Sequence, residues 1–364
     1  MSFNDLARFM NGLRRASPID PAWVPMSCSW ILLAVSCLAS TSQIYVVNGA
    51  GDTVDVIDPA ADRVVQRIEG MEGAFATAFS PDGGRVYVSN EFKDLIYVVD
   101  RRSGKILKKI PASGHPSMMA MSRDGSRIFV NLQSKFPQSG IDIIDTVTLK
   151  RVETIATKAP MHDIYLTQDG KYLVSASDIG QFLVVIDAQT RQPCWTVSFD
   201  QRVYTLAVEG RPDGSPNRIF VQLRGLNGFA VVDFNQHRTV GTVNLPTEPS
   251  GFLAGFRNPS HGIGIAPDGK TLWVNSGEAN SVFVYALPEL TVIGHVALPV
   301  RSLPGNHRLG SQPNWLTFTG DGRKVYVSNT WLNSVSAIDA ATMNIVSTIA
   351  VGQLPRIVDT LTVP

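Results

Sequence analysis

The chain has 364 residues, with 32 Lys or Arg against 31 Asp or Glu, so its formal net charge is +1. This balance excludes any global electrostatic reason to bind nucleic acid or a membrane surface. Charged residues make up only 17% of the chain, which fits a β-rich protein with much buried strand.

Residues 1–42 differ in composition from the rest of the chain. Arg14 and Arg15 precede a polar stretch, and an apolar run at 30–39 (WILLAVSCLA) is followed by the small residues at 40–42. This order of basic, apolar and small residues predicts a secretory signal peptide. The apolar run is too short to span a bilayer comfortably. We therefore expect a periplasmic or secreted protein that is not an integral membrane protein after signal removal.

Alternatives remain open for this segment. It can instead form a hydrophobic helix that caps the domain, and Met26 can be the true start of a more compact signal. A lipoprotein anchor at Cys37 is the weaker alternative, because Ala34 stands where such sites usually carry Leu. Cys28 and Cys37 lie in this segment and Cys194 would be left alone, so no disulfide framework is expected. The motif CxxCH does not occur, which excludes covalent c-type haem.

The stretch Ala74–Ile110 has the pattern of four consecutive short strands. A turn at Pro81-Asp82-Gly83 separates the first two, because Pro presets φ, Asp bonds its own backbone and Gly accepts positive φ. The third strand is apolar throughout, as expected for a strand covered on both faces. The fourth alternates, as expected for an outer strand with one wet face. The expected strands are Ala76–Phe79, Arg85–Ser89, Leu95–Val99 and Lys105–Ile110.

This unit repeats along the chain. The Asp-Gly turn recurs at Asp124, Asp169, Asp213, Asp268 and Asp321, and the first three intervals from Asp82 are 42, 45 and 44 residues. An Asp also closes the third strand of most units, at Asp58, Asp100, Asp145, Asp187, Asp233 and Asp339. A period of roughly 40–45 residues with four strands per unit indicates the blades of a β-propeller. Because these Asp residues recur in nearly every blade, they are interpreted as architecture that bonds local backbone N–H groups.

The segments YVVN at 45–48, RVYVSN at 85–90 and KVYVSN at 324–329 each precede an apolar strand. With SPDGGRVYVSN and APDGKTLWVNS, they resemble the YVTN-type (40-residue repeat) β-propeller family over about residues 43–364. The resemblance implies the fold. It leaves the function open, because the family includes surface proteins, binding proteins and enzyme-like members.

We predict an all-β, seven-bladed propeller at 43–364, preceded by the signal peptide or N-terminal extension at 1–42. The first blade has no innermost strand before Ile44, whereas residues 352–358 resemble the start of an eighth repeat. We therefore expect the C-terminal strand to pair into the first blade and close the ring, which removes exposed sheet edges.

Two insertions lengthen the later repeats, at 246–260 and 299–313. Both are rich in Gly and Pro and are predicted to be loops on the face where the innermost strands begin. Long loops on one face of a rigid scaffold are where function is usually found.

The first residues of the innermost strands ring the mouth of the axial channel. Counting back from the Asp-Gly turns, with alignment by eye for two blades, places these residues at the mouth: Phe75, Ser117, His162, Tyr204, His261, Asn314 and Arg356. His115 and His307 lie close to two of these positions. The predicted ligand-binding residues are Phe75, His115, His162, Tyr204, His261, Asn314, Trp315 and Arg356.

Three interpretations of the histidines remain open. His115, His162, His261 and His307 can bind a divalent metal, with Glu72, Asp163 and Glu248 as nearby carboxylates. They can instead hydrogen-bond an organic ligand in a pocket with the aromatic residues and Arg356. In the third interpretation they only cap neighbouring backbone. GxSxG, P-loop and HExxH motifs are absent from the sequence.

The favoured function is an exported binding or interaction protein for a small molecule or a protein partner, with its site at the channel mouth. Its cofactor and catalytic residues are unknown from sequence. The alternative is a metal-assisted enzyme of lyase or lactonase type, or an oxidoreductase-associated propeller. That alternative rests on analogy between folds alone.

Overall fold

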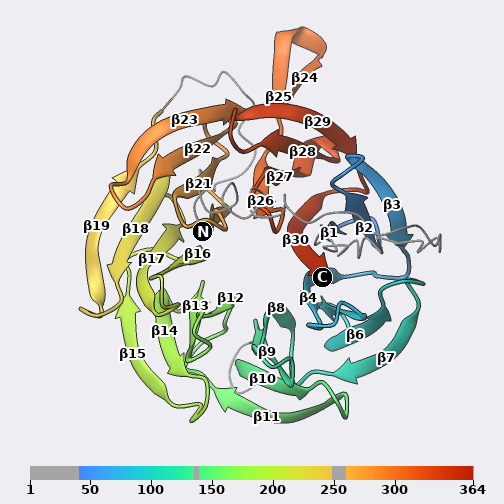
Figure 1. Cartoon of the computed structure of the whole chain (residues 1–364), viewed down its shortest axis with the longest axis vertical. Coiled ribbons are helices and arrows are strands. Elements are labelled where there is room, and N and C mark those ends of the chain that lie inside the picture. Colours follow the sequence, from blue (N-terminus) through green and yellow to red (C-terminus); the bar gives the residue numbers. More distant parts are fainter. Residues whose placement is uncertain (1–40, 135–138, 248–259, 364) are drawn as a thin grey trace, which may run out of the picture. The chain divides into compact units, whose positions relative to one another are not determined.

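The computed structural model describes residues 41–134, 139–247 and 260–363. Within these ranges, the strands form seven four-stranded antiparallel sheets arranged around a common centre, plus one two-stranded hairpin (Figure 1). The prediction of a seven-bladed β-propeller is confirmed. The described residues contain no helix with the length and apolar character that a membrane span requires.

The strands of the first four blades have the following bounds. Blade one contains β1 (Thr41–Asn48), β2 (Thr53–Asp58), β3 (Arg63–Ile68) and β30 (Pro355–Val363). Blade two contains β4 (Ala74–Phe79), β5 (Arg85–Asn90), β6 (Leu95–Asp100) and β7 (Ile106–Pro111). Blade three contains β8 (Pro116–Met121), β9 (Arg127–Leu132), β10 (Gly140–Asp145) and β11 (Lys150–Ala156). Blade four contains β12 (Asp163–Leu166), β13 (Tyr172–Ser177), β14 (Phe182–Asp187) and β15 (Pro193–Ser198).

The remaining three blades follow the same order from the centre outward. Blade five contains β16 (Val203–Gly210), β17 (Pro216–Leu223), β18 (Gly228–Asp233) and β19 (Arg238–Asn244). Blade six contains β20 (Ile263–Ile265), β21 (Thr271–Ser276), β22 (Ser281–Ala286) and β23 (Thr291–Ala297). Blade seven contains β26 (Pro313–Phe318), β27 (Lys324–Asn329), β28 (Ser334–Asp339) and β29 (Asn344–Ala350). The two short 3-10 helices are η1 (Pro304–Asn306) and η2 (Thr330–Leu332).

The C-terminal strand closes the ring as predicted. β30 is the innermost strand of blade one and pairs antiparallel with β1, with Tyr45 opposite Asp359. Ile357, Val358 and Leu361 of this strand are buried, and they belong to the same apolar cluster as Ile44. The two ends of the propeller are therefore joined by hydrogen bonds and by packing.

Burial along each blade follows the periodicity of its sequence. Val98 and the other central residues of β6 are buried, whereas β3 alternates between exposed and partly buried side chains before it ends at the buried Ile68. Inner and middle strands therefore contact neighbouring blades on both faces, and outer strands keep one face in water. Between blades six and seven, for example, the rings of Trp273 and Phe318 meet edge to face at 6.1 Å.

The recurring Asp residues hold turns. In the Asp-Gly turns the glycines have φ between 64° and 81°, and Asp82 Oδ1 accepts a hydrogen bond from the Gly84 amide at 2.9 Å. Asp100, at the end of a third strand, accepts from the amide and hydroxyl of Ser103. Hydrogen bonds lower the pKa of both carboxyls: that of Asp82 through the Ser80 hydroxyl and then the Gly84 amide, and that of Asp100 through the hydroxyl and amide of Ser103. The geometry is that of the architectural role expected from the repetition.

The insertion at 299–313 differs from its prediction as a loop. It forms a hairpin of β24 (Val300–Leu303) and β25 (His307–Gly310), which extends outward between blades six and seven (Figure 1). Gly305 and Asn306 take φ of 77° and 61°, so the glycine permits the reversal between the two strands. Of the other insertion, residues 248–259 lie outside the described part of the chain.

Candidate functional site

A cavity of about 380 Å³, here called the mouth pocket, lies where the innermost strands begin. Its lining includes seven of the eight residues predicted to bind a ligand: Phe75, His162, Tyr204, His261, Asn314, Trp315 and Arg356. These residues come from or immediately precede β4, β12, β16, β20, β26 and β30. Gln312 and Pro313, at the end of the second insertion, also line it.

Aromatic rings and imidazoles form the walls of the mouth pocket. Phe75 meets the His162 ring edge to face, with centroids 5.9 Å apart. His261 lies between two aromatic rings, 5.2 Å from Tyr204 and 5.7 Å from Trp315. Such walls suit a flat organic ligand, because rings stack or meet edge to face at these separations.

The orientation of His261 fixes its hydrogen-bonding role. Its Nδ1 lies 2.8 Å from the carbonyl oxygen of Asn314. A carbonyl only accepts, so Nδ1 carries the proton and, in the neutral ring, Nε2 carries a lone pair. Burial lowers the pKa of His261 to about 4, with the Arg356 charge acting in the same direction. At neutral pH this side chain is therefore an uncharged hydrogen-bond acceptor or a metal ligand.

His162 is also neutral. Burial, followed by the charges of His261 and Arg356, lowers the pKa of His162 to about 3. Its Nδ1 is buried and has no hydrogen-bond partner among the described residues. An unpaired polar atom at such a depth is costly unless something else satisfies it.

Arg356 is the charged residue in the described lining of the mouth pocket. Its guanidinium stands 4.9 Å from the centroid of the Phe75 ring, and Nη1 donates to Glu91 Oε1 at 3.2 Å. The ring contact and the ion pair hold the guanidinium in place. An arginine has five donors in a planar fork, so a carboxylate can still be bound.

The structure does not bring all four predicted metal histidines together. His115 is exposed, and its Nδ1 lies 2.6 Å from the Glu91 carbonyl oxygen and 3.2 Å from Asp94 Oδ1. His307 is exposed on β25. Neither lines the mouth pocket, and among the described residues no group of three or more His, Cys, Asp or Glu is placed to hold a metal ion.

The other predicted residues near the mouth have structural partners. Ser117 is fully buried, and its hydroxyl donates to backbone carbonyl oxygens, including that of His162. Glu72 forms an ion pair with Lys93. Asp163 accepts the amides of Ile164 and Leu206, which links blade four to blade five. Glu248 lies outside the described residues.

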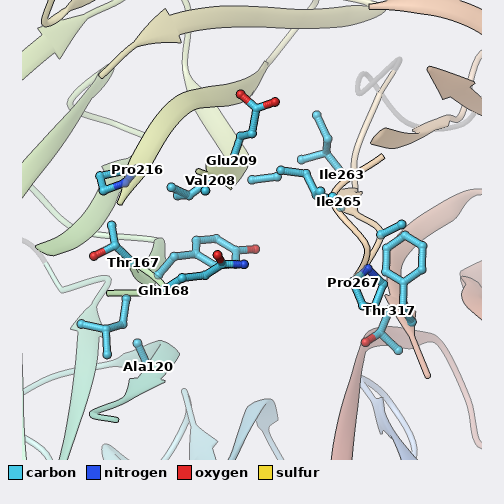
Figure 2. A pocket seen from close by; sticks show the side chains of 18 of the residues that line it. Ala120, Thr167, Gln168, Val208, Glu209, Pro216, Ile263, Ile265, Pro267 and Thr317 are labelled. Carbon is cyan, nitrogen blue, oxygen red and sulfur yellow. The ribbon is translucent and has the colours of Figure 1, made fainter. Parts of the chain in front are cut away.

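Sequence reasoning missed a second and larger cavity. This axial cavity has a volume of about 930 Å³. It is lined by the later residues of the same inner strands and by the turns that follow them, whereas the mouth pocket lies where those strands begin. Thr167 and Gln168 face Pro267 and Thr317 across it (Figure 2). Trp315 lines both cavities. The signal that was overlooked is Asp359, the one carboxylate of the closing strand.

These features define a seven-bladed β-propeller with a pocket at each end of its axis. None of the protein-family models matches this chain, and none of the curated proteins does. Membership of the YVTN-type family therefore stays a prediction.

Solved structures share the fold. One is hydrazine synthase from Kuenenia stuttgartiensis, with 18% identity and a TM-score of 0.59, covering 74% of this chain and 77% of that one. Another is the dihydro-heme d1 dehydrogenase NirN in complex with DHE, with 16% identity and a TM-score of 0.57, covering 85% of this chain and 73% of that one. At such low identity these similarities concern the architecture alone.

Proposed function

We propose that this protein is a binding protein whose mouth pocket takes a flat organic acid. The observation that carries the proposal is the position of Arg356, fixed over Phe75 beside two neutral imidazoles in a cavity of about 380 Å³. The guanidinium supplies charge for a carboxylate, and the rings supply flat apolar walls. Nε2 of His261 adds a requirement for an N–H or O–H donor on the ligand.

Indole-3-acetate has all three features and is a suitable probe. Calorimetric titration should show 1:1 binding of indole-3-acetate, with indole-3-acetamide at least tenfold weaker because it lacks the charge. Equal affinity for the acid and the amide would show that the charge of Arg356 does not contribute to ligand recognition. No binding of either compound, or of larger aromatic acids such as naphthoate, would overturn the proposal.

A second candidate ligand is an iron tetrapyrrole. His261 donates its Nδ1 proton to a backbone carbonyl, and a histidine that ligates a metal through Nε2 usually makes this kind of hydrogen bond with its other ring nitrogen. The NirN structure named above is a complex with DHE. Titration with haemin should give a shifted Soret band that is lost in His261→Ala and kept in His295→Ala, a histidine on outer strand β23. An unchanged spectrum would exclude this candidate.

We further propose that the protein is exported. The support is the order of basic, apolar and small residues within residues 1–42. Expression of the full chain in a Gram-negative host, followed by fractionation and intact mass measurement, tests this. Recovery from the periplasm with a shortened N-terminus is expected. Full-length protein confined to the cytoplasm would contradict the proposal.

A further inference from the structure

We propose that the axial cavity is a second binding site, specific for an organic cation of the aryl- or alkylammonium type. The proposal does not depend on the mouth pocket or on its ligand. It rests on the size of the cavity, on the carboxylate that Asp359 presents to it, and on its aromatic and thioether walls.

The cavity has room for a ligand. Its volume is about 930 Å³, and every blade contributes to its lining: Thr77, Met118, Ile164, Ala207, Ile263, Trp315 and Asp359. Figure 2 shows lining side chains from several blades around one shared space. A large, preformed cavity with a few convergent polar groups is the usual form of a small-molecule site.

The charged side chains that line the cavity are mainly negative. They differ in whether a neighbouring cation neutralises them. Glu209 is neutralised by Arg218, whose Nε and Nη2 each donate to it at 2.7 Å. Arg211 donates to the carbonyl oxygen of Pro216. Asp359 accepts the Thr77 hydroxyl at 2.6 Å, and the ion pairs of the described residues do not include it.

Asp359 is therefore a carboxylate in the lining of the axial cavity without a cationic partner among the described residues. Burial raises the pKa of Asp359 to about 6, which leaves it mostly ionised above pH 7. Asp163 is close enough to interact with it, but burial raises the pKa of Asp163 to about 7, so this group is only partly ionised near neutral pH, and its oxygens are held by backbone amides. A partly buried carboxylate whose donors are the hydroxyl and the amide of Thr77, with no cation from the described ranges beside it, favours a ligand that brings a positive charge.

The walls are suited to the apolar part of such a ligand. Tyr165, Trp315 and Phe318 are among the residues that line the cavity, and aromatic rings attract ammonium groups. Three methionines from one strand, Met118, Met119 and Met121, supply adaptable thioether surface. Tyr165 keeps its phenolic proton, because burial and the charges of Asp163 and Asp359 raise its pKa well above the usual value.

A charge series on the unaltered protein provides the first test. Benzylammonium, benzyl alcohol and benzoate share a ring and differ in charge. At pH 7.5 we expect benzylammonium to bind at least tenfold more tightly than benzyl alcohol, and benzoate to bind least. Equal affinity of the amine and the alcohol, tighter binding of benzoate, or no binding of benzylammonium would overturn the proposal.

Methyl-¹³C methionine NMR locates the binding in the same protein. Benzylammonium should shift the methyl signals of Met118, Met119 and Met121. It should leave unchanged those of Met71, between β3 and β4, and Met343, between β28 and β29, which do not line the cavity. Shifts confined to other methionines would place the ligand elsewhere and contradict the assignment.

The variant Asp359→Asn then tests the carboxylate. Its side chain can still accept from Thr77, and it should bind benzylammonium about tenfold more weakly while its affinity for benzyl alcohol is unchanged. The matched control is Glu289→Gln, which removes an exposed carboxylate in the turn between β22 and β23. Equal benzylammonium affinity in the two variants would refute the role of Asp359. If Asp359→Asn does not fold, the charge series and the methionine shifts decide the question.

Discussion

The two cavities of this propeller are built by the same inner strands and share Trp315, yet they differ in charge and in wall chemistry. The mouth pocket has Arg356 as its charged group, with imidazoles and aromatic rings around it. The axial cavity has Asp359 and three methionines. Both charged residues lie on β30, three residues apart.

The difference shows how a repeat protein acquires distinct sites. Residues that recur in every blade, such as the turn-holding Asp100, build the frame. Residues that occur once at a given level of the axis, such as Arg356 or Asp359, give each end its chemistry. The closing strand contributes to both ends and also completes the ring.

The largest effect is expected from removing the closing strand. Deletion of residues 355–364 exposes the partners of Ile357, Val358 and Leu361, which are at most 4% exposed. Burial of three such side chains contributes about 5–9 kcal/mol, comparable to the stability of a typical protein. We expect thermal denaturation to show no cooperative transition above 37 °C. A control deletion of residues 362–364 keeps these three side chains and should still melt cooperatively. A full deletion that melts like the intact protein would contradict the closure.

The next effect separates the two ends. Arg356→Gln removes the charge of the mouth pocket, and loss of a charge-assisted hydrogen bond should weaken indole-3-acetate binding about 10- to 100-fold. Benzylammonium binding in the axial cavity should be unchanged. Calorimetry with both ligands measures this, with Arg323→Gln on an exposed turn as control. Equal weakening of both ligands would mean that the variant disturbs β30 as a whole.

A smaller effect concerns the pH dependence of stability. Burial lowers the pKa of His162 to about 3 and of His261 to about 4. Unfolded histidines bind protons below about pH 6.5, so through them acidification destabilises the fold. Burial raises the pKa of Asp163 to about 7 and of Asp359 to about 6. Folded carboxyls then retain protons that the unfolded chain loses above about pH 4, so through them acidification stabilises the fold.

Between pH 4.5 and 6, the two histidines and the two carboxyls therefore have opposite effects on how the free energy of unfolding changes with pH. Asp359→Asn should make the free energy of unfolding fall more steeply on acidification, and His261→Gln should make it fall less steeply. Each change of slope is at most about 1.4 kcal/mol per pH unit. Denaturant unfolding at several pH values measures it. Unchanged slopes would show that these groups titrate normally in the folded protein, and slopes that change in the reverse sense would mean pKa shifts of the opposite sign; either result contradicts the prediction.

The smallest effect tests the architectural role of the recurring Asp residues. Asp100→Ala removes the bonds to Ser103 and should lower the melting temperature by less than about 3 °C. Binding at both ends should be unaltered. A loss of either ligand would give this recurring Asp a role beyond the turn.

Much of the fold was predictable because each blade repeats the same local chemistry. The Pro-Asp-Gly turn, the apolar third strand and the missing first strand before Ile44 together predicted seven blades and the closing strand. Counting back from the turns also placed Phe75, His162 and His261 at one mouth, since equivalent positions in a rotational repeat meet at the axis.

What failed depended on contacts that the repeat does not encode. His115 was expected at the mouth, but its ring turns to the Glu91 carbonyl and Asp94 in the loop of the preceding blade. The hairpin at Val300–Gly310 arises from cross-strand pairing within an insertion that has no counterpart in other blades. The axial cavity was missed because its volume depends on side-chain packing from all seven blades.

The most direct test of the account is a competition between the two ligands. Indole-3-acetate is titrated into the protein by calorimetry, alone and in the presence of saturating benzylammonium. Two pockets with opposite charge preference predict one bound acid per chain in both cases, with a Kd that changes less than threefold. Displacement of the acid, or a Kd at least tenfold weaker, would show one shared site and contradict the account.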